Sequence, residues 1–364
     1  MYGRVKGATP GGEPVTSFAL LSVQIDRVAR SKKNAVRRDV IAIGGSAGAV
    51  DALRPLFSQL PKDIPAAILV VVHLSARGPG IARTFSSIAS GFPVHEAQAG
   101  QELLAGNIYL AVPDRHLMVI EGKIVLGTGP RENMARPSID ALFRSVALGR
   151  GPRAVGVLLS GKLNDGVAGL EAIQQRGGAI AVQDPVDAVE AEMLSNALER
   201  VRPDAVVPGA ELAATILQLL DKPVPLAREP SDALRLEVDI AWGKPSTTEL
   251  MKGVGQPSPF SCPACGGVLT QIAGEGLWRF RCQVGHAYTA DALDAAKESS
   301  LDEALRVALR VMEERAELVT RLAARDDRPQ LGVASVYADR AADYRAYADV
   351  LRNALMSSRR AAVP

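Results

Sequence analysis

DVIAIGGSAG, residues Asp39 to Gly48, is the stretch that decides the fold of this 364-residue chain. Its apolar first half has the length of a buried strand, and its glycine-rich second half predicts a sharp turn into a helix. A second apolar run, AAILVVV at 66–72, repeats the pattern, and short apolar runs alternate with helical ones as far as Leu220. Buried strands that alternate with helices predict an α/β fold, a mostly parallel sheet with helices on both faces.

The turn GGSAG, residues 44–48, is typical of the elbow that presents a serine nucleophile between a strand and a helix. It would expose the Ser46 hydroxyl at the strand tip, beside backbone N–H groups that stabilise an oxyanion. A phosphate- or dinucleotide-binding turn is the alternative, because such turns are also rich in glycine. The dinucleotide motif needs a third glycine where this sequence has Asp51, whose charge would repel a pyrophosphate.

His73 ends the second apolar run and is the candidate general base for Ser46. Consecutive strands usually lie side by side, so their tips would bring the two residues within reach of each other. His95 and His116 are competing candidates. The first lies inside a short strand pattern, and the second begins a predicted hairpin.

Asp165 follows the apolar run AVGVLLS at 154–160 and is the candidate third member of a catalytic triad. It would hold the imidazole of His73 and stabilise its charged form. The alternative is a helix N-cap, a role that aspartate favours and that the neighbouring Asn164 would serve equally well. Position along the chain does not decide between these two roles.

All three cysteines lie in one short region that also contains a histidine. Cys262-x-x-Cys265 and Cys282-x-x-x-His286 form two close pairs, and such a set of four ligands predicts a structural zinc site. Because a closed set of ligands leaves no position for water, we assign the site to folding or partner docking, and a metal-dependent hydrolase is disfavoured. Three inert thiols or a redox Cys-x-x-Cys are the alternatives, although no thioredoxin-like pattern surrounds the motif.

Composition excludes several classes of function. A net charge of +2 gives no support for binding nucleic acid or an anionic membrane surface. No apolar run is long enough to cross a bilayer, and the clustered cysteines do not suggest the disulfide framework of a secreted domain. We therefore expect a cytoplasmic protein without membrane insertion.

Periodicity and composition divide the chain into five parts. The linker prediction rests on proline, serine and charge, and the helical hairpin on apolar residues that recur every three or four positions around the break DDRPQLG at 326–332. The expected parts are a disordered tail over 1–38, a catalytic domain over 39–220, a linker over 221–260, a zinc-ribbon-like module over 261–290 and a helical hairpin over 297–358.

Five motifs occur in one order, and together they resemble the catalytic domain of the bacterial chemotaxis-receptor protein-glutamate methylesterases (CheB-type). They are GGSAG at 44–48, VVHLS at 71–75, PDRHL at 113–117, RPSIDALF at 136–143 and LLSGKLNDGVAGL at 158–170. The resemblance spans about residues 39–220 and implies a Rossmann-like methylesterase domain. It also implies Ser46 as nucleophile, His73 and Asp165 as its partners, and no cofactor for catalysis.

The implied reaction is hydrolysis of glutamyl methyl esters on the cytoplasmic helices of methylated chemoreceptors, an adaptation step of a chemosensory pathway. Many relatives also deamidate receptor glutamines. Besides the receptors, the expected partners are chemosensory adaptor proteins or a second copy, bound through the C-terminal helices. The cysteine region resembles the zinc-ribbon-like tail of some stand-alone relatives.

Two features depart from the family pattern. Lys162 stands where the family commonly has methionine, three residues before Asp165. The 38 residues before the catalytic domain are too few for the receiver domain that inhibits typical members, so we expect no phosphorelay control in cis. The alternative function is a catalytically inactive zinc-ribbon adaptor or scaffold in a signalling complex, which the three intact triad positions disfavour and Lys162 keeps open.

Overall fold

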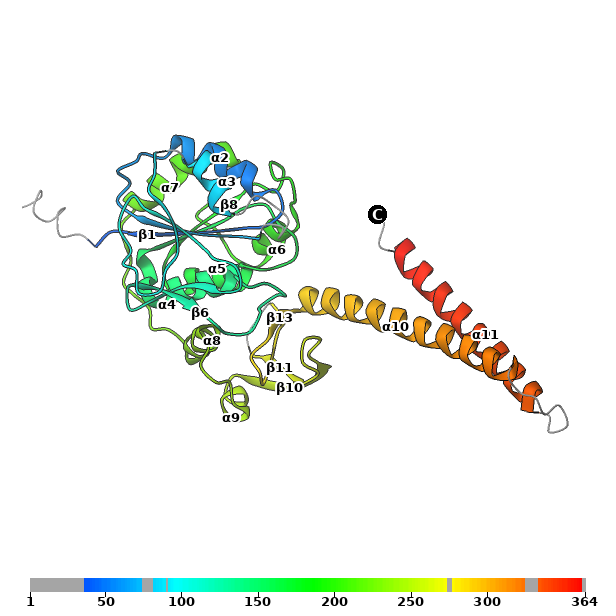
Figure 1. Ribbon diagram of the computed structural model, residues 1–364. Coiled ribbons are helices and arrows are strands. Elements are labelled where there is room, and N and C mark those ends of the chain that lie inside the picture. The colour runs from blue at the N-terminus through cyan, green and yellow to red at the C-terminus, as the bar shows by residue number, and fades with distance from the viewer. Residues whose placement is uncertain (1–35, 74–80, 90, 274–276, 325–332, 362–364) are drawn as a thin grey trace, which may run out of the picture.

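The computed structural model describes residues 36–73, 81–89, 91–273, 277–324 and 333–361, and its centre is a parallel sheet of seven strands (Figure 1). The strands follow the order β3-β4-β2-β1-β7-β8-β9. This confirms the predicted α/β architecture. In chain order the strands are β1 (Val40–Gly45), β2 (Ala67–Val72), β3 (Val94–Glu96), β4 (Ile108–Leu110), β7 (Ala154–Leu158), β8 (Ala179–Gln183) and β9 (Ala205–Val207).

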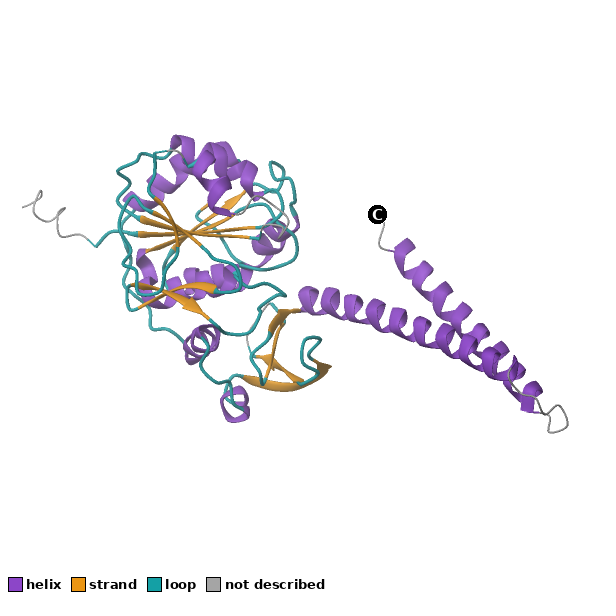
Figure 2. Cartoon of the chain, in the orientation of Figure 1, coloured by secondary structure: helices purple, strands orange, loops and turns teal. Residues whose placement is uncertain are grey.

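Helices cover both faces of this sheet (Figures 1 and 2). Each face has its own apolar core, because the central strands are buried on both sides. A hairpin of β5 (His116–Ile120) and β6 (Lys123–Gly127) packs on the α4 side. One face carries α2 (Ala49–Gln59), α3 (Ile81–Ile88) and α7 (Leu212–Asp221), and the other carries α4 (Ile139–Arg150), α5 (Val167–Gln175) and α6 (Glu192–Arg200).

After β1 the chain adds β2, β3 and β4 on one side of this strand. It then adds β7, β8 and β9 on the other side. In the register of the sheet, Gly45 of β1 lies opposite Val72 of β2, and Gly44 lies opposite Leu158 of β7. The segments that follow these three strands therefore leave the sheet together. This is the switch point at which ligands of open α/β sheets bind.

The segment 221–260, predicted as a linker, is instead structured. It contains α8 (Asp232–Trp242), α9 (Thr248–Lys252) and most of β10 (Gly255–Ser261). Leu234 and Val238 of α8 join the core beneath α4. Proline and serine lie between these short elements and inside β10, which explains why composition suggested a linker.

The predicted tail and module boundaries also need adjustment. Most of the tail lies outside the described residues, but Arg38 is buried and donates hydrogen bonds to the carbonyls of Leu219 and Lys222. The cysteine region forms a four-stranded antiparallel sheet of β10, β11 (Val268–Ile272), β12 (Arg279–Cys282) and β13 (Ala287–Thr289).

The predicted helical hairpin is confirmed and is longer than expected. Its first helix, α10 (Ala290–Ala324), begins directly after β13, so no spacer separates it from the cysteine region. It pairs with α11 (Val333–Ala361), and the two project away from the rest of the chain (Figure 2). None of the helices that the structure describes has both the length and the apolar character to span a membrane.

A buried network of ion pairs joins the sheet domain, α8 and the cysteine region. Arg281 of β12 is fully buried and pairs with Glu132 at 2.9 Å and with Glu237 of α8 at 3.4 Å. Arg144 of α4 pairs with the same two carboxylates, and Arg279 pairs with Glu237 at 2.8 Å. Burial opposes the charge of Glu237, but the three arginines hold the pKa of its carboxyl below the ordinary value.

Removing the charge of Glu237 should destabilise the chain, because the buried guanidinium groups would lose a partner. We expect Glu237→Gln to lower the free energy of unfolding by about 3–5 kcal/mol in urea titrations. Asp239→Asn on the same helix is the matched control, since its pair with Lys244 is largely exposed and should contribute about 1 kcal/mol or less. Equal midpoints for the two variants would show that the network does not hold the parts together.

Candidate functional site

Ser46 lies in the sharp turn between β1 and α2. Its N–H donates to the carbonyl of Ser160 at 2.9 Å, which ties the turn to the segment after β7. Gly48 adopts a left-handed conformation with φ of 78° and begins α2. Gly161 also has to be small, because a Cβ there would come 3.0 Å from the Cβ of Ser46. Ser46 therefore lies in a tight strand-to-helix turn, as the glycines predict.

His73 follows β2, beside Ser46. The register places Gly45 opposite Val72, and the N–H of His73 donates to the carbonyl of Gly45 at 3.1 Å. The residues that come next on the two strands, Ser46 and His73, thus leave the sheet side by side. His73 Nε2 lies 3.2 Å from Oδ2 of Asp165.

Asp165 is buried, and its carboxylate sits at the N-terminus of α4. Its oxygens accept hydrogen bonds from the N–H groups of Ile139 at 2.7 Å and Asp140 at 3.2 Å, and from the Ser138 hydroxyl at 2.8 Å. Backbone donors and the helix dipole both favour negative charge at this position. Asp165 therefore accepts bonds from the N-terminus of a helix that lies before it in sequence, and it does not cap the helix that follows it.

The charges of His73 and Asp165 stabilise each other. Burial alone would lower the pKa of His73, but the contact with Asp165, together with a hydrogen bond to the Pro137 carbonyl, raises it above its ordinary value. Burial would raise the pKa of Asp165, but His73 and the donors from Ile139 and Ser138 hold it below its ordinary value. His73 is thus paired with a buried, ionised carboxylate at the strand end next to that of Ser46. A serine, a histidine and a carboxylate are the groups that nucleophilic acyl transfer uses.

The two competing histidines lie elsewhere. His95 on β3 contacts Asn107 at 2.9 Å and stacks on Tyr109. His116 is buried, accepts a hydrogen bond from the N–H of Ser138 at 3.2 Å, and lies 3.0 Å from the Pro130 carbonyl. Burial lowers the pKa of His116. Both of its ring contacts are to backbone groups, so we assign it a structural role next to the N-terminus of α4.

Three polar residues around Asp165 had no sequence signal of their own. The Asn133 side chain donates to Oδ1 of Asp165 at 3.2 Å and to Oδ2 of Asp140 at 3.0 Å. Burial and the nearby charge of Asp165 raise the pKa of Asp140 to about 7. Ser138 falls inside the motif RPSIDALF, but only the fold shows that its hydroxyl faces Asp165.

Lys162 points away from the triad. Its ammonium group pairs with Glu190 at 3.3 Å, and its side chain is 60% exposed. Asn164, the alternative cap, bonds instead to Asn196 and to Asp291 at the start of α10. The lysine therefore places no charge against His73 or Asp165.

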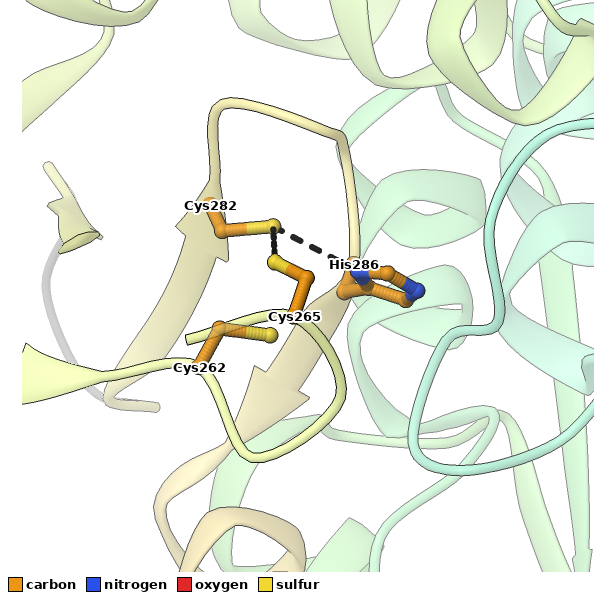
Figure 3. Close-up of side chains that lie close together, drawn as sticks. All are labelled: Cys262, Cys265, Cys282 and His286. Atoms are coloured by element: carbon orange, nitrogen blue, oxygen red, sulfur yellow. Dashed lines mark hydrogen bonds between the residues drawn. The ribbon is translucent and has the colours of Figure 1, made fainter. Parts of the chain in front are cut away.

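The second predicted cluster is assembled at one end of the four-stranded sheet (Figure 3). The ligand atoms of Cys262, Cys265, Cys282 and His286 all lie within 4.8 Å of one another. Sγ of Cys265 lies 3.6 Å from Sγ of Cys282, too far for a disulfide, and Nδ1 of His286 lies 3.5 Å from the latter. Zinc–sulfur bonds of ~2.3 Å in a tetrahedron separate two sulfurs by about 3.8 Å, so this donor set fits zinc.

Comparison with known proteins identifies the family. The family model described as CheB methylesterase matches residues 41–216. A Leptospira interrogans protein, whose name gives protein-glutamate methylesterase/protein-glutamine glutaminase provisionally, is 32% identical over 182 residues that cover 50% of this chain and 94% of that protein. The chain belongs to the CheB methylesterase family.

Other members of the CheB family match the same half of the chain. A protein-glutamate methylesterase/protein-glutamine glutaminase of Paramagnetospirillum magneticum is 40% identical and one of Methanosarcina mazei is 34% identical, over 50% and 55% of this chain. The matches span 51% and 58% of those two proteins, about half of their length. The crystal structure of the Thermotoga maritima CheB methylesterase catalytic domain matches with 28% identity and a TM-score of 0.47, over 50% of this chain and 100% of that one.

The raised pKa of His73 can be measured by NMR titration of the four histidines. We expect the midpoint of His73 to lie above 6.5 and to fall below 6.5 in Asp165→Asn, because burial then dominates. The pair stabilises the fold fully between about pH 4 and pH 6.5. This contribution is lost as the pH rises through the raised pKa of His73 or falls through the lowered pKa of Asp165. His116 is the internal control and should titrate below 6.5 in both chains; an unchanged His73 midpoint in Asp165→Asn would refute the pairing.

The cysteine and histidine cluster predicts metal content. We expect about one zinc per purified chain, because there is a single set of four ligands. His286→Ala should lose most of the metal in elemental analysis, whereas His95→Ala, which is remote from the cluster, should keep it. Equal zinc in the two variants would mean that the cluster is not the metal site.

Proposed function

We propose that this chain is a serine-dependent protein-glutamate methylesterase that uses Ser46, His73 and Asp165. The observation that carries the proposal is the pair of His73 and Asp165 beside the Ser46 elbow, in a chain of the CheB family. A catalytically inactive adaptor would have no need to bury an ionised carboxylate against a histidine at this position. The proposal concerns the domain of residues 39–220, most of which the family model matches.

In the proposed mechanism, the Ser46 hydroxyl attacks the carbonyl carbon of a glutamyl methyl ester. His73 accepts the serine proton and returns it to the departing methoxide, which leaves as methanol. Asp165 holds the imidazole and stabilises its charged form, and N–H groups at the start of α2 would bind the oxyanion. Water then hydrolyses the acyl-enzyme by the same steps, and attack on a glutamine side chain would release ammonia instead.

His73 must be neutral to accept the proton from Ser46. Because Asp165 raises the pKa of His73, activity should fall as the pH decreases through that raised value. No cofactor takes part in these steps. Zinc bound by the three cysteines and His286 would stabilise the fold of the four-stranded sheet and supply no catalytic group.

The proposed substrates are methylated cytoplasmic helices of chemoreceptors, and the proposed place of reaction is the cytoplasm. We propose that the α10–α11 hairpin binds adaptor proteins of a chemosensory pathway or a second copy of the chain. The support is a set of exposed apolar side chains on these two helices. It includes Leu301, Leu318, Tyr347, Val350 and Met356.

The nucleophile is tested by labelling with a serine-reactive fluorophosphonate and by methanol release from a methylated receptor fragment. We expect Ser46→Ala to abolish labelling and to lower turnover by about 10³-fold or more. His73→Ala and Asp165→Ala should each lose most activity, and the double variants should lose little more, because the three groups act as a unit.

Ser58→Ala is the matched control, since this exposed serine lies near the far end of α2 from Ser46 and bonds only locally to the Pro55 carbonyl. It should label and turn over like the unmodified chain. Labelling or turnover that persists in Ser46→Ala would refute the assignment, and a wild-type chain that neither labels nor releases methanol would favour the adaptor hypothesis.

A further inference from the structure

Asn133 is a buried amide that links two parts of the chain. Its Nδ2 donates to the carboxylates of Asp165 and Asp140, at 3.2 and 3.0 Å. Its Oδ1 accepts from the N–H of Thr289 in β13, at 3.0 Å. The side chain therefore bonds to the triad carboxylate on one side and to the cysteine region on the other.

The backbone at Asn133 is held by the same strand. Its N–H donates to the carbonyl of Ala287 at 2.8 Å, and the N–H of Ala287 donates back to the carbonyl of Arg131 at 3.3 Å. Asn133 and Met134 both have positive φ, 48° and 65°. Such a turn is unfavourable for methionine, so contacts from outside the turn are needed to fix it, and β13 provides them.

β13 follows the second pair of metal ligands without a gap. The N–H of Cys282 bonds to the carbonyl of His286 at 3.0 Å, and Ala287 is the next residue. Gly285, within this loop, packs so closely that a Cβ there would lie 3.2 Å from Pro130. The metal-binding loop therefore leads directly into β13, the strand that bonds to Asn133.

A second contact involves Asn164, the residue before Asp165 in sequence. Its side chain donates to the carboxylate of Asp291 at the start of α10. The side chains of Asn164 and Asn133 are both nearly inaccessible to solvent. The cysteine region therefore bonds to Asn133, which contacts Asp165, and the start of α10 bonds to Asn164, the residue before Asp165. Neither asparagine has a part in the proposed chemistry.

We propose that Asn133 is a positioning residue for Asp165, and that the metal-bound cysteine region keeps it in place through β13. The proposal rests on the proposed serine esterase function. Asn133 does not touch a substrate, and it acts by fixing the carboxylate that orients His73. Loss of the metal would free β13, and with it Asn133, so that the reactivity of Ser46 depends on a site that takes no part in the reaction.

The test measures fluorophosphonate labelling of Ser46 in the full chain, separating the rate constant from the final labelled fraction. Asn133→Gly keeps a residue that tolerates positive φ and removes all three side-chain hydrogen bonds. Asn133→Asp keeps an acceptor for Thr289 but replaces the donor that faces Asp165. Both should lower the rate constant by about 10- to 100-fold, since small displacements of catalytic groups have effects of this size, and leave the final labelled fraction unchanged.

Met134→Gly is the matched control, because it makes the same kind of change at the neighbouring residue of the turn, whose side chain is partly exposed. It should label within about twofold of the unmodified chain. If the Asn133 variants only reduce the final labelled fraction, Asn133 has a general folding role and the proposal is wrong. A rate constant that is unchanged in both Asn133 variants would overturn it equally.

The metal arm uses a zinc chelator on the unmodified chain and on Asn133→Gly. Chelation should slow labelling of the unmodified chain by about tenfold and slow Asn133→Gly by less than about twofold further, because the variant has already lost the link. Equal slowing of both chains would show that the metal does not act through Asn133.

A readout that needs no reaction separates this proposal from the proposed function. The signal of the His73 ring N–H that faces Asp165 can be followed by NMR, and it should shift or vanish in Asn133→Gly but not in Met134→Gly. If that happens in a chain that never labels, Asn133 positions Asp165 and the esterase assignment fails. Normal labelling with an unperturbed signal in Asn133→Gly would overturn the positioning role alone.

Discussion

The burial of an ionised carboxylate, Asp165, is the constraint on which the rest of the site depends. An unpartnered buried charge costs several kcal/mol, so the fold must surround it with donors. The N-terminus of α4 supplies two backbone N–H groups and the Ser138 hydroxyl. Once these are in place, the remaining edge of the carboxylate faces His73 at the tip of β2. The sheet register then places the histidine next to Ser46.

The same constraint acts on a larger scale between the parts of the chain. Glu132, Arg144, Glu237 and Arg281 are all buried, and none could keep its charge without the others. Because they come from the sheet domain, α8 and β12, burying them requires the three parts to pack as one. The cysteine region is therefore packed firmly against the sheet domain. Asn133 lies at this junction, where it bonds to Thr289 on one side and to Asp165 on the other.

Much of the catalytic half could be predicted from sequence because its signals are local. Apolar runs of strand length gave the sheet, and the glycines around Ser46 gave the elbow, since turn geometry restricts residue type at those positions. His73 was found because it directly follows a buried strand. Segment 221–260 was assigned wrongly as a linker, because its helices are short and owe their stability to α4 and the four-stranded sheet, which local composition does not report.

By itself, the sequence predicted the alternation of strands and helices over residues 39–220 and the helical hairpin. It also predicted that the three cysteines gather with His286. The sequence favoured His73, but only the tertiary structure showed which histidine meets Asp165, because the strand order sets the neighbours of His73, His95 and His116. The tertiary structure also brought Asn133 together with Asp165 and Thr289, which are 32 and 156 residues away along the chain. Contacts over such separations depend on how strands and domains pack, and no short-range pattern encodes them.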